Sequence, residues 1–231
     1  MPTLTDEEFG SITLRRSARA THVRIRVGPD GRLRASLPLY APVFLVKRLL
    51  KTSRSQLRTM LSEQQTESIF ENGMQIGKSH TLIVRPSAKN TTIAKRHGQQ
   101  IIVSLSPEHT LQHPNVVRTV RDAVIEALRI EAKSYLTKRL AFLAANNGFM
   151  YEKVRFSHAS GRWGSCSSNG TISLNIALMK LPFELIDYVL IHELSHTVQM
   201  NHSETFWKLV QSSDPQYLMH QRALKKETPS I

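Results

Sequence analysis

The sequence HELSH at residues 192–196 sets two histidines four positions apart, with a glutamate directly after the first. In an α-helix such residues share one face, about 5–6 Å apart at Cβ. His192 and His196 can therefore direct two imidazoles at one Zn²⁺ ion, and Glu193 can reach a metal-bound water without being a ligand itself. The spacing predicts a hydrolytic metal site.

Catalytic zinc usually has three protein ligands and an open position for water. His202 follows His196 by six residues, which lets the chain leave the helix and turn back to the metal. Glu204, His220 and Glu227 lie further along the chain and are the alternatives. We predict His202 as the third ligand.

The chemistry expected of this set is hydrolysis. Zinc lowers the pKa of a bound water towards about 7, and Glu193 would take its proton as the water attacks a carbonyl carbon. We therefore predict a zinc-dependent metallohydrolase that acts as a peptidase. It would hold one Zn²⁺ per chain, with Glu193 as the general base. A non-catalytic, metal-stabilised binding module is an alternative, although such a module needs no base beside its ligand.

The motif needs a helix, and the sequence predicts one that begins at Pro182 and runs to His196. Proline is tolerated at a helix start because the N–H it lacks has no partner there. Alternating apolar residues predict short strands around 154–156 and 172–176. A long amphipathic helix is predicted over 114–147, and two short helices over about 203–212 and after 214–215.

Residues 9–40 alternate aliphatic and polar side chains, the pattern of strands with one buried face. A turn is predicted at 28–31, a helix over 41–64, strands at 74–84 and 100–105, and a polar loop over 86–99. The exposed face of the N-terminal sheet is expected to carry Arg15, Arg24, Arg26 and Arg34.

Positive charge is concentrated in this N-terminal part. The chain has 31 basic and 18 acidic residues, and residues 1–60 hold 12 and 4 of them. A basic sheet face suits a polyanion such as nucleic acid, although positive charge also serves solubility alone. The four arginines are thus nucleic-acid candidates, and a DNA-associated protease is a second functional hypothesis.

These patterns predict an α+β protein with a β-rich basic region over residues 1–112 and a metallopeptidase domain over 113–231, or one compact unit. Residues 161–175 are expected to form a hairpin or an edge strand, and an edge strand can bind an extended peptide. Candidates for binding substrate or the oxyanion are Arg162, Tyr188, Tyr217 and His220. Cys166 is a conceivable soft ligand, but a small buried hydrophobe is expected.

Several linked motifs occur in order over about residues 153–225: RWGSC at 162–166, GTISLN at 170–175, Pro182 with IDYV at 186–189, HELSH at 192–196, MNHS at 200–203, FW at 206–207, and Pro215 with Tyr217. In these the chain resembles the YgjP-like metallopeptidases, which are related to the SprT-like zinc proteases. The resemblance implies a zincin-like α+β domain with His192, His196 and His202 as ligands and Glu193 as catalytic base. The histidine spacing also equals that of metzincins, but Gln199 replaces their turn glycine.

The sequence also gives expectations about the compartment and the partners of the protein. No apolar stretch approaches the roughly 18–20 residues of a membrane span, and the first residues lack the apolar core of a signal peptide. The single cysteine suits a reducing compartment. We expect a cytoplasmic protein that acts on protein or peptide substrates, with no membrane partner; the sequence indicates no oligomeric state.

Overall fold

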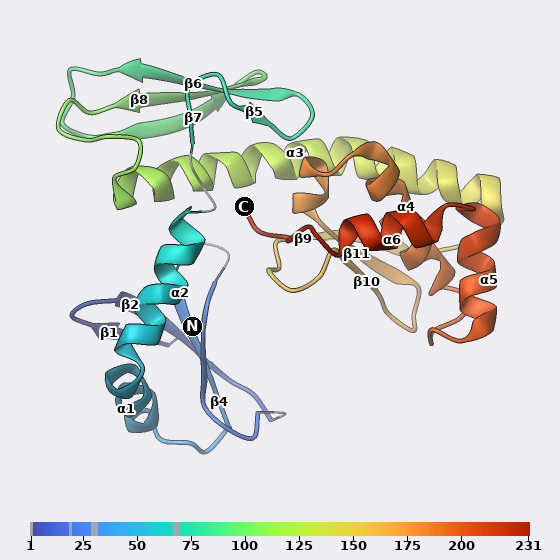
Figure 1. Cartoon of the computed structure of the whole chain (residues 1–231), viewed down its shortest axis with the longest axis horizontal. Helices are drawn as coiled ribbons and strands as arrows, with labels where there is room; N and C mark the ends of the chain where they lie inside the picture. The colour runs from blue at the N-terminus through green and yellow to red at the C-terminus, as the bar shows by residue number, and fades with distance from the viewer. Residues whose placement is uncertain (1, 19, 29–31, 67–69) are drawn as a thin grey trace. The chain divides into compact units, whose positions relative to one another are not determined.

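The computed structural model describes residues 2–18, 20–28, 32–66 and 70–231 (Figure 1). The predicted turn at 28–31 lies mostly outside the described residues. The chain forms two compact units, Met1–Phe70 and Glu71–Ile231.

The N-terminal unit is a four-stranded sheet with helices packed on one face. Its described elements are β1 (Thr3–Asp6), β2 (Gly10–Arg16), β3 (Arg24–Val27), β4 (Leu33–Leu37), α1 (Phe44–Thr52) and α2 (Arg54–Thr66). The strand order is β1-β2-β4-β3, with β2 and β4 parallel and the other pairs antiparallel. The alternation in the sequence therefore predicted β2, β3 and β4, whereas β1 was not predicted.

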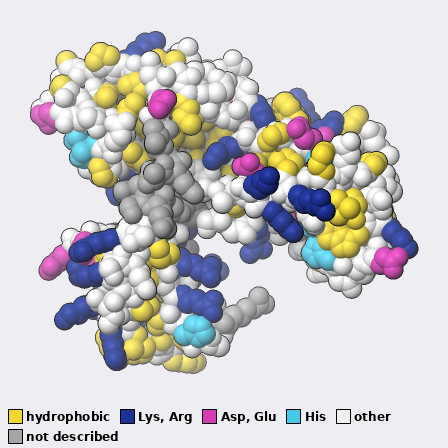
Figure 2. Space-filling view, viewed as in Figure 1, with side chains coloured by type: hydrophobic (Ala, Val, Ile, Leu, Met, Phe, Trp, Pro, Cys, Tyr) yellow, Lys and Arg dark blue, Asp and Glu magenta, His cyan; other side chains and the backbone are white. Residues whose placement is uncertain are grey.

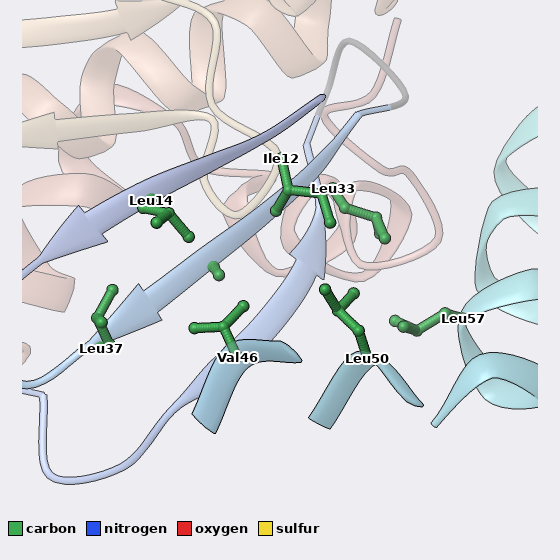
Figure 3. Packing of buried hydrophobic residues seen from close by; sticks show 8 residues of the cluster. Ile12, Leu14, Leu33, Leu37, Val46, Leu50 and Leu57 are labelled. Atoms are coloured by element: carbon green, nitrogen blue, oxygen red, sulfur yellow. The ribbon is translucent and has the colours of Figure 1, made fainter. Parts of the chain in front are cut away.

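A small apolar core holds this unit together (Figure 3). Aliphatic side chains of β2 and β4 meet those of α1 and α2, and the fully buried cluster consists of Ile12, Leu14, Leu33, Ala35, Leu37, Val46, Leu50 and Leu57. Because strand side chains alternate between faces, the residues between them point away from this core. The arginines of the sheet are accordingly exposed.

The helix predicted over 41–64 is in fact two helices. α1 ends at Thr52 and α2 begins at Arg54. Ser53 between them has φ −112° and ψ 17°, outside the helical region, and its backbone N–H donates to the carbonyl of Leu49. Apolar periodicity persists across this break, which is why the sequence reads as one helix.

The second unit begins with a sheet of the same topology as the first. Its strands are β5 (Gln75–Ile76), β6 (His80–Pro86), β7 (Ile93–His97) and β8 (Gln100–Leu105). Their order is β5-β6-β8-β7, with β6 and β8 parallel. The polar loop predicted over 86–99 was wrong in part, because it contains β7. This edge strand is mostly polar and exposes Ile93, so it lacks the apolar pattern of a buried strand.

The long helix α3 (Pro114–Asn147) packs against β7 and β8 (Figure 1). Its bounds match the predicted 114–147. Pro114 begins the helix, and Gly148 ends it with φ +70°, a left-handed conformation that glycine adopts without strain. The domain boundary predicted near residue 112 falls between β8 and α3, inside the second unit, because α3 packs on the sheet that precedes it.

The elements around the histidines follow α3. They are β9 (Lys153–Ser157), β10 (Gly164–Cys166), β11 (Thr171–Asn175), the 3-10 helix η1 (Ile176–Lys180), α4 (Phe183–Ser195), α5 (Glu204–Ser213) and α6 (Tyr217–Leu224). The three strands form a sheet of order β10-β11-β9, in which β10 is an edge strand. α4 packs against β10, α3, α5 and α6.

The predicted α+β class is confirmed, since helices and mixed sheets occur in both units. Among the helices that the structure describes, none combines the length and apolarity that crossing a membrane requires. The expected compartment stays a prediction.

Candidate metal centre

Helix α4 holds the first two histidines of the site. Its apolar residues are buried on several sides, including Leu190, Ile191 and Leu194. Such a helix is fixed by packing around most of its circumference, so its polar side chains are held in place. His192 lies in the last turn, and His196 is the C-cap residue, still with helical dihedral angles.

The orientation of His196 is set by the turn that follows α4. Its Nδ1 lies 3.1 Å from the carbonyl oxygen of Gln199. A carbonyl only accepts hydrogen bonds, so Nδ1 carries the proton and donates it, and Nε2 keeps its lone pair. This arrangement is typical of a metal-binding imidazole.

His202 comes back to the other two histidines just before α5. Ser203 is the N-cap of that helix, and its hydroxyl accepts from the backbone N–H of Phe206. The Nε2 atoms of His202 and His192 lie 3.2 Å apart. One ring nitrogen from each of His192, His196 and His202 lies within 4.8 Å of the others.

Aromatic side chains of α5 support the three rings. Phe206 is fully buried, and its ring centroid lies 5.0, 4.5 and 4.8 Å from those of His192, His196 and His202. Trp207 lies 5.6 Å from His202 and also contacts His192. α5 therefore packs against the histidine cluster, and His202 lies just before its first turn.

These donors fit a divalent metal ion. Burial, followed by repulsion from His196 and His202, lowers the pKa of His192 to about 4. Burial also lowers the pKa of His196. Both are thus neutral donors at neutral pH. Tetrahedral coordination at about 2.0–2.1 Å sets ligand nitrogens roughly 3.3 Å apart, close to the separation found for His192 and His202.

Glu193 is a buried carboxylate beside this cluster. Glu193 is only 5% exposed, and its Oε2 atom has no hydrogen-bond partner among the described residues. Burial raises the pKa of Glu193 to about 8, although the charge of Arg162 lowers it. A dication bound nearby would lower the pKa again and favour the carboxylate. A buried, unpartnered carboxylate is costly for stability, which points to function.

The edge strand β10 lies directly against Glu193. A Cβ on Gly164 would lie 2.5 Å from Oε1 of Glu193, closer than atoms can approach. The loop before β10 is fastened by Asn175, whose side-chain amide donates to the carbonyls of Ala159 and Arg162. Glycine at 164 is therefore what lets the strand and the carboxylate meet.

Comparison with known families decides the class of this domain. The model of the YgjP-like family, metallopeptidase domain, matches residues 21–227. The chain belongs to the YgjP-like metallopeptidase family. The resemblance stated from the sequence is confirmed, and the match extends over both units.

Two other comparisons accompany the family match. The crystal structure of the metallopeptidase zymogen abylysin from Pyrococcus abyssi is 28% identical to this YgjP-like chain, with a TM-score of 0.36. The match covers 39% of this chain and 92% of abylysin. No curated protein matches the chain significantly.

The other predicted ligands lie apart from the YgjP-like histidine cluster. Among the described residues, only the three histidines group closely enough to hold one metal ion. Glu204 is exposed and pairs with Lys208. His220 binds Asp214 instead, through Nδ1 at 2.7 Å. Glu227 and Cys166 are likewise outside the group of three histidines. Burial, together with the charge of Glu193, raises the pKa of the Cys166 thiol.

The residues predicted for substrate or oxyanion binding have diverse surroundings. Arg162 is exposed and close enough to influence Glu193 electrostatically. The Tyr188 ring is buried between His192 and His220, at 6.1 and 6.3 Å. Tyr217 stacks on Trp207 at 5.6 Å. Their roles stay predictions.

Sequence reasoning missed the residues that position the site. Gly164, Asn175 and the carbonyl of Gln199 orient neighbours rather than bind metal. No spacing rule identifies them, because each acts across a gap between elements. Only Asn175 could have been noticed from the sequence, because it is a polar residue at the end of a strand with apolar residues. In the structure its side chain caps η1.

Proposed function

We propose that this metallopeptidase uses zinc held by His192, His196 and His202, with Glu193 as its general base. The observation that carries the proposal is the convergence of three imidazoles next to the buried carboxyl group of Glu193, whose Oε2 has no hydrogen-bond partner among the described residues. A purely structural site would leave that carboxylate without a purpose.

A metal ion in this position would supply Lewis acidity, polarising the scissile carbonyl and making a bound water acidic. The remaining work falls to the chain's own residues. Gln199 holds His196 in the required tautomer. Glu193 accepts the water proton and can return it to the leaving amine.

The substrate would lie along β10. This strand is an edge of its sheet, and edge strands bind extended peptides through backbone hydrogen bonds. Gly164 brings the strand within contact of Glu193, so a peptide paired with β10 would run past the carboxylate. Arg162 precedes β10 and is our candidate for contacting the substrate or the oxyanion.

The test compares wild type with Glu193→Gln on an unfolded protein substrate. Gln preserves the size of the side chain but cannot accept the proton, so kcat/KM should fall by about 10² to 10⁴. Zinc content, measured by mass spectrometry of the metal, should stay at one per chain. Loss of cleavage with zinc retained supports the base role.

Equal cleavage by both proteins would refute the role of Glu193. If neither protein cleaves any member of a broad substrate panel while both hold zinc, the metal-stabilised binding module becomes the better explanation.

A second function rests on the N-terminal sheet. Cross-strand register sets Arg15 and Arg24 on either side of Ser36, and Arg34 beside Arg26. All four arginines are exposed, and Lys and Arg side chains dominate the charged surface of this unit in Figure 2. Guanidinium groups in rows suit the phosphates of nucleic acid, so we propose recruitment to DNA as the alternative.

Changing the four arginines to alanine should abolish DNA binding at about 50 mM salt, because phosphate contacts dominate such affinity. The matched control removes four charges elsewhere, at Lys208, Arg222, Lys225 and Lys226. Fluorescence anisotropy with a 30-base-pair duplex measures both. An absence of binding by wild type, or equal loss in the control, would exclude this function.

A further inference from the structure

A basic pocket lies on the outer face of the β9–β10–β11 sheet. Its volume is about 590 Å³, and it is lined by residues of all three strands and of the loops around β10. Three of the lining side chains are cationic, those of Lys153, Arg155 and Arg162. The others are polar or small, chiefly serines and threonines between 165 and 173.

Strand register explains why these side chains gather. Arg155 lies opposite Ser173 on β11, which in turn lies opposite Ser165 on β10. Lys153 lies opposite Thr171. The residues between them on β11, Ile172 and Leu174, are fully buried on the other face. Polar and cationic side chains thus share one face by alternation.

Positive charge predominates among the residues that line the pocket. The described residues that line it include no acidic side chain and no aromatic ring. Lys153, Arg155 and Arg162 are exposed, and none of them forms an ion pair with a described acidic residue. Hydroxyl groups such as those of Ser165 and Ser173 add neutral donors, which suit a carboxylate.

The pocket adjoins the strand proposed to bind substrate. β10 contributes Ser165 to it, and Arg162 belongs to the loop that leads into β10. On the same strand, Gly164 faces Glu193 on the opposite side of the sheet. A peptide paired with β10 would direct every second side chain towards the pocket and the others towards the metal side.

We propose that this pocket selects substrates with an acidic side chain, Asp or Glu, close to the bond that is cleaved. The inference rests on the proposed function, since it names the substrate class of that site. Nucleic acid fits less well, because the pocket is small, lies on three short strands, and offers no described aromatic ring on which a base could stack.

Peptide binding tests the pocket apart from catalysis. Zinc-loaded Glu193→Gln protein is titrated into two fluorescent peptides that differ only in having Glu or Gln at alternate positions. The same titrations follow for Lys153→Gln/Arg155→Gln in that background. The control is Lys225→Gln/Lys226→Gln, which removes two exposed charges from the end of α6.

We expect the Glu peptide to bind about three- to tenfold more tightly than the Gln peptide, as for two solvent-exposed ion pairs. The preference should vanish in Lys153→Gln/Arg155→Gln and persist in the control. Reversing the charge of both side chains, in Lys153→Glu/Arg155→Glu, should make the protein bind a Lys-containing peptide more tightly than the Glu peptide. Equal affinity for the Glu and Gln peptides would overturn the proposal. So would a competing oligonucleotide whose binding depends on the same two residues.

Cleavage of a random peptide library by wild type provides the second measurement. Acidic residues should be enriched at positions two apart, because those side chains share one face of a bound strand. If no peptide is cleaved, the proposed function fails, yet the binding titrations still decide the pocket. Cleavage without acidic enrichment would overturn the pocket while leaving the peptidase intact.

Discussion

The histidines and Glu193 are positioned by neighbouring residues. His196 donates to the carbonyl of Gln199, Phe206 packs beneath the imidazoles, and Gly164 leaves space for Glu193. Catalytic groups must be held to within a fraction of an ångström to be effective. Small changes in these neighbours should therefore affect activity more than metal binding.

Gly164→Ala tests this at one atom. The added Cβ would overlap the Glu193 carboxylate, whose Oε1, Cγ and Cδ lie 2.5, 2.7 and 2.8 Å away. Glu193 must shift, so kcat/KM should fall at least about tenfold. Zinc content should not change, because the three imidazoles are untouched.

Gly161→Ala is the matched control, since a Cβ at Gly161 meets no described atom within 4 Å. It should retain wild-type activity. If Gly164→Ala is as active as the control, the contact between β10 and Glu193 does not matter to catalysis.

Residue spacing predicted the histidine cluster but could not predict its supports. Positions 192 and 196 share a helix face by helical geometry, so sequence alone brings them together. The return of His202 depends on the turn at 197–201 and on the Ser203 cap. The contact of Gly164 with Glu193 depends on how a sheet packs on a helix, which periodicity does not encode.

Helix α3 packs against both sheets of the second unit. Glu131 in this helix is buried and fastens the turn between β5 and β6. It accepts from the backbone N–H groups of Lys78 and Ser79, from the Ser79 hydroxyl, and from Nδ1 of His80 at 2.6 Å. Burial would raise the pKa of Glu131, but these hydrogen bonds outweigh it and lower the pKa below 4.5.

Glu131→Gln should therefore destabilise the protein in a pH-dependent way. At pH 7 the loss of hydrogen bonds to a charged group should cost about 2–3 kcal/mol of the free energy of unfolding. Because the folded-state pKa lies below the ordinary value, the stabilisation is complete above 4.5 and is lost as pH falls through the folded-state pKa.

Denaturant unfolding from pH 7 down to pH 3 measures this. The gap between wild type and Glu131→Gln should narrow as the pH falls below about 4.5, whereas the exposed Glu126→Gln control on the same helix should differ little from wild type at any pH. A gap that is constant across the range would contradict the assignment.

Element prediction succeeded where a strong period meets clear ends. α3 has an apolar stripe, Pro114 at its start and Gly148 after its end, and its bounds were predicted. β7 was missed because an exposed edge strand needs no apolar face. The break at Ser53 was missed because both α1 and α2 present apolar residues to one core.

Two four-stranded sheets, one in each unit, share the same strand order. β1-β2-β4-β3 and β5-β6-β8-β7 have the same topology, each with its central pair parallel. The sequence shows no repeat, because topology is preserved by pairing and burial rather than by particular residues. The unit boundary after Phe70 was not predicted either, since strand-rich segments lie on both sides of it.

Removal of metal should distinguish the two units. The N-terminal unit has its own core, whereas α4 and α5 are joined by the histidine cluster. Metal at a thousandfold excess over its dissociation constant stabilises by about 4 kcal/mol. After chelation, backbone amides of 183–213 should exchange hydrogen faster, while those of β2 and β4 stay unchanged. Faster exchange throughout both units would show that they unfold together.

We propose that three histidines hold the catalytic zinc. X-ray absorption at the zinc edge of wild type and His202→Ala tests it most directly. Wild type should show three imidazole nitrogens at about 2.0–2.1 Å and one lighter oxygen ligand, and His202→Ala should show two imidazoles. Three imidazoles retained in His202→Ala, or a sulfur at about 2.3 Å in wild type, would show that the zinc has other ligands.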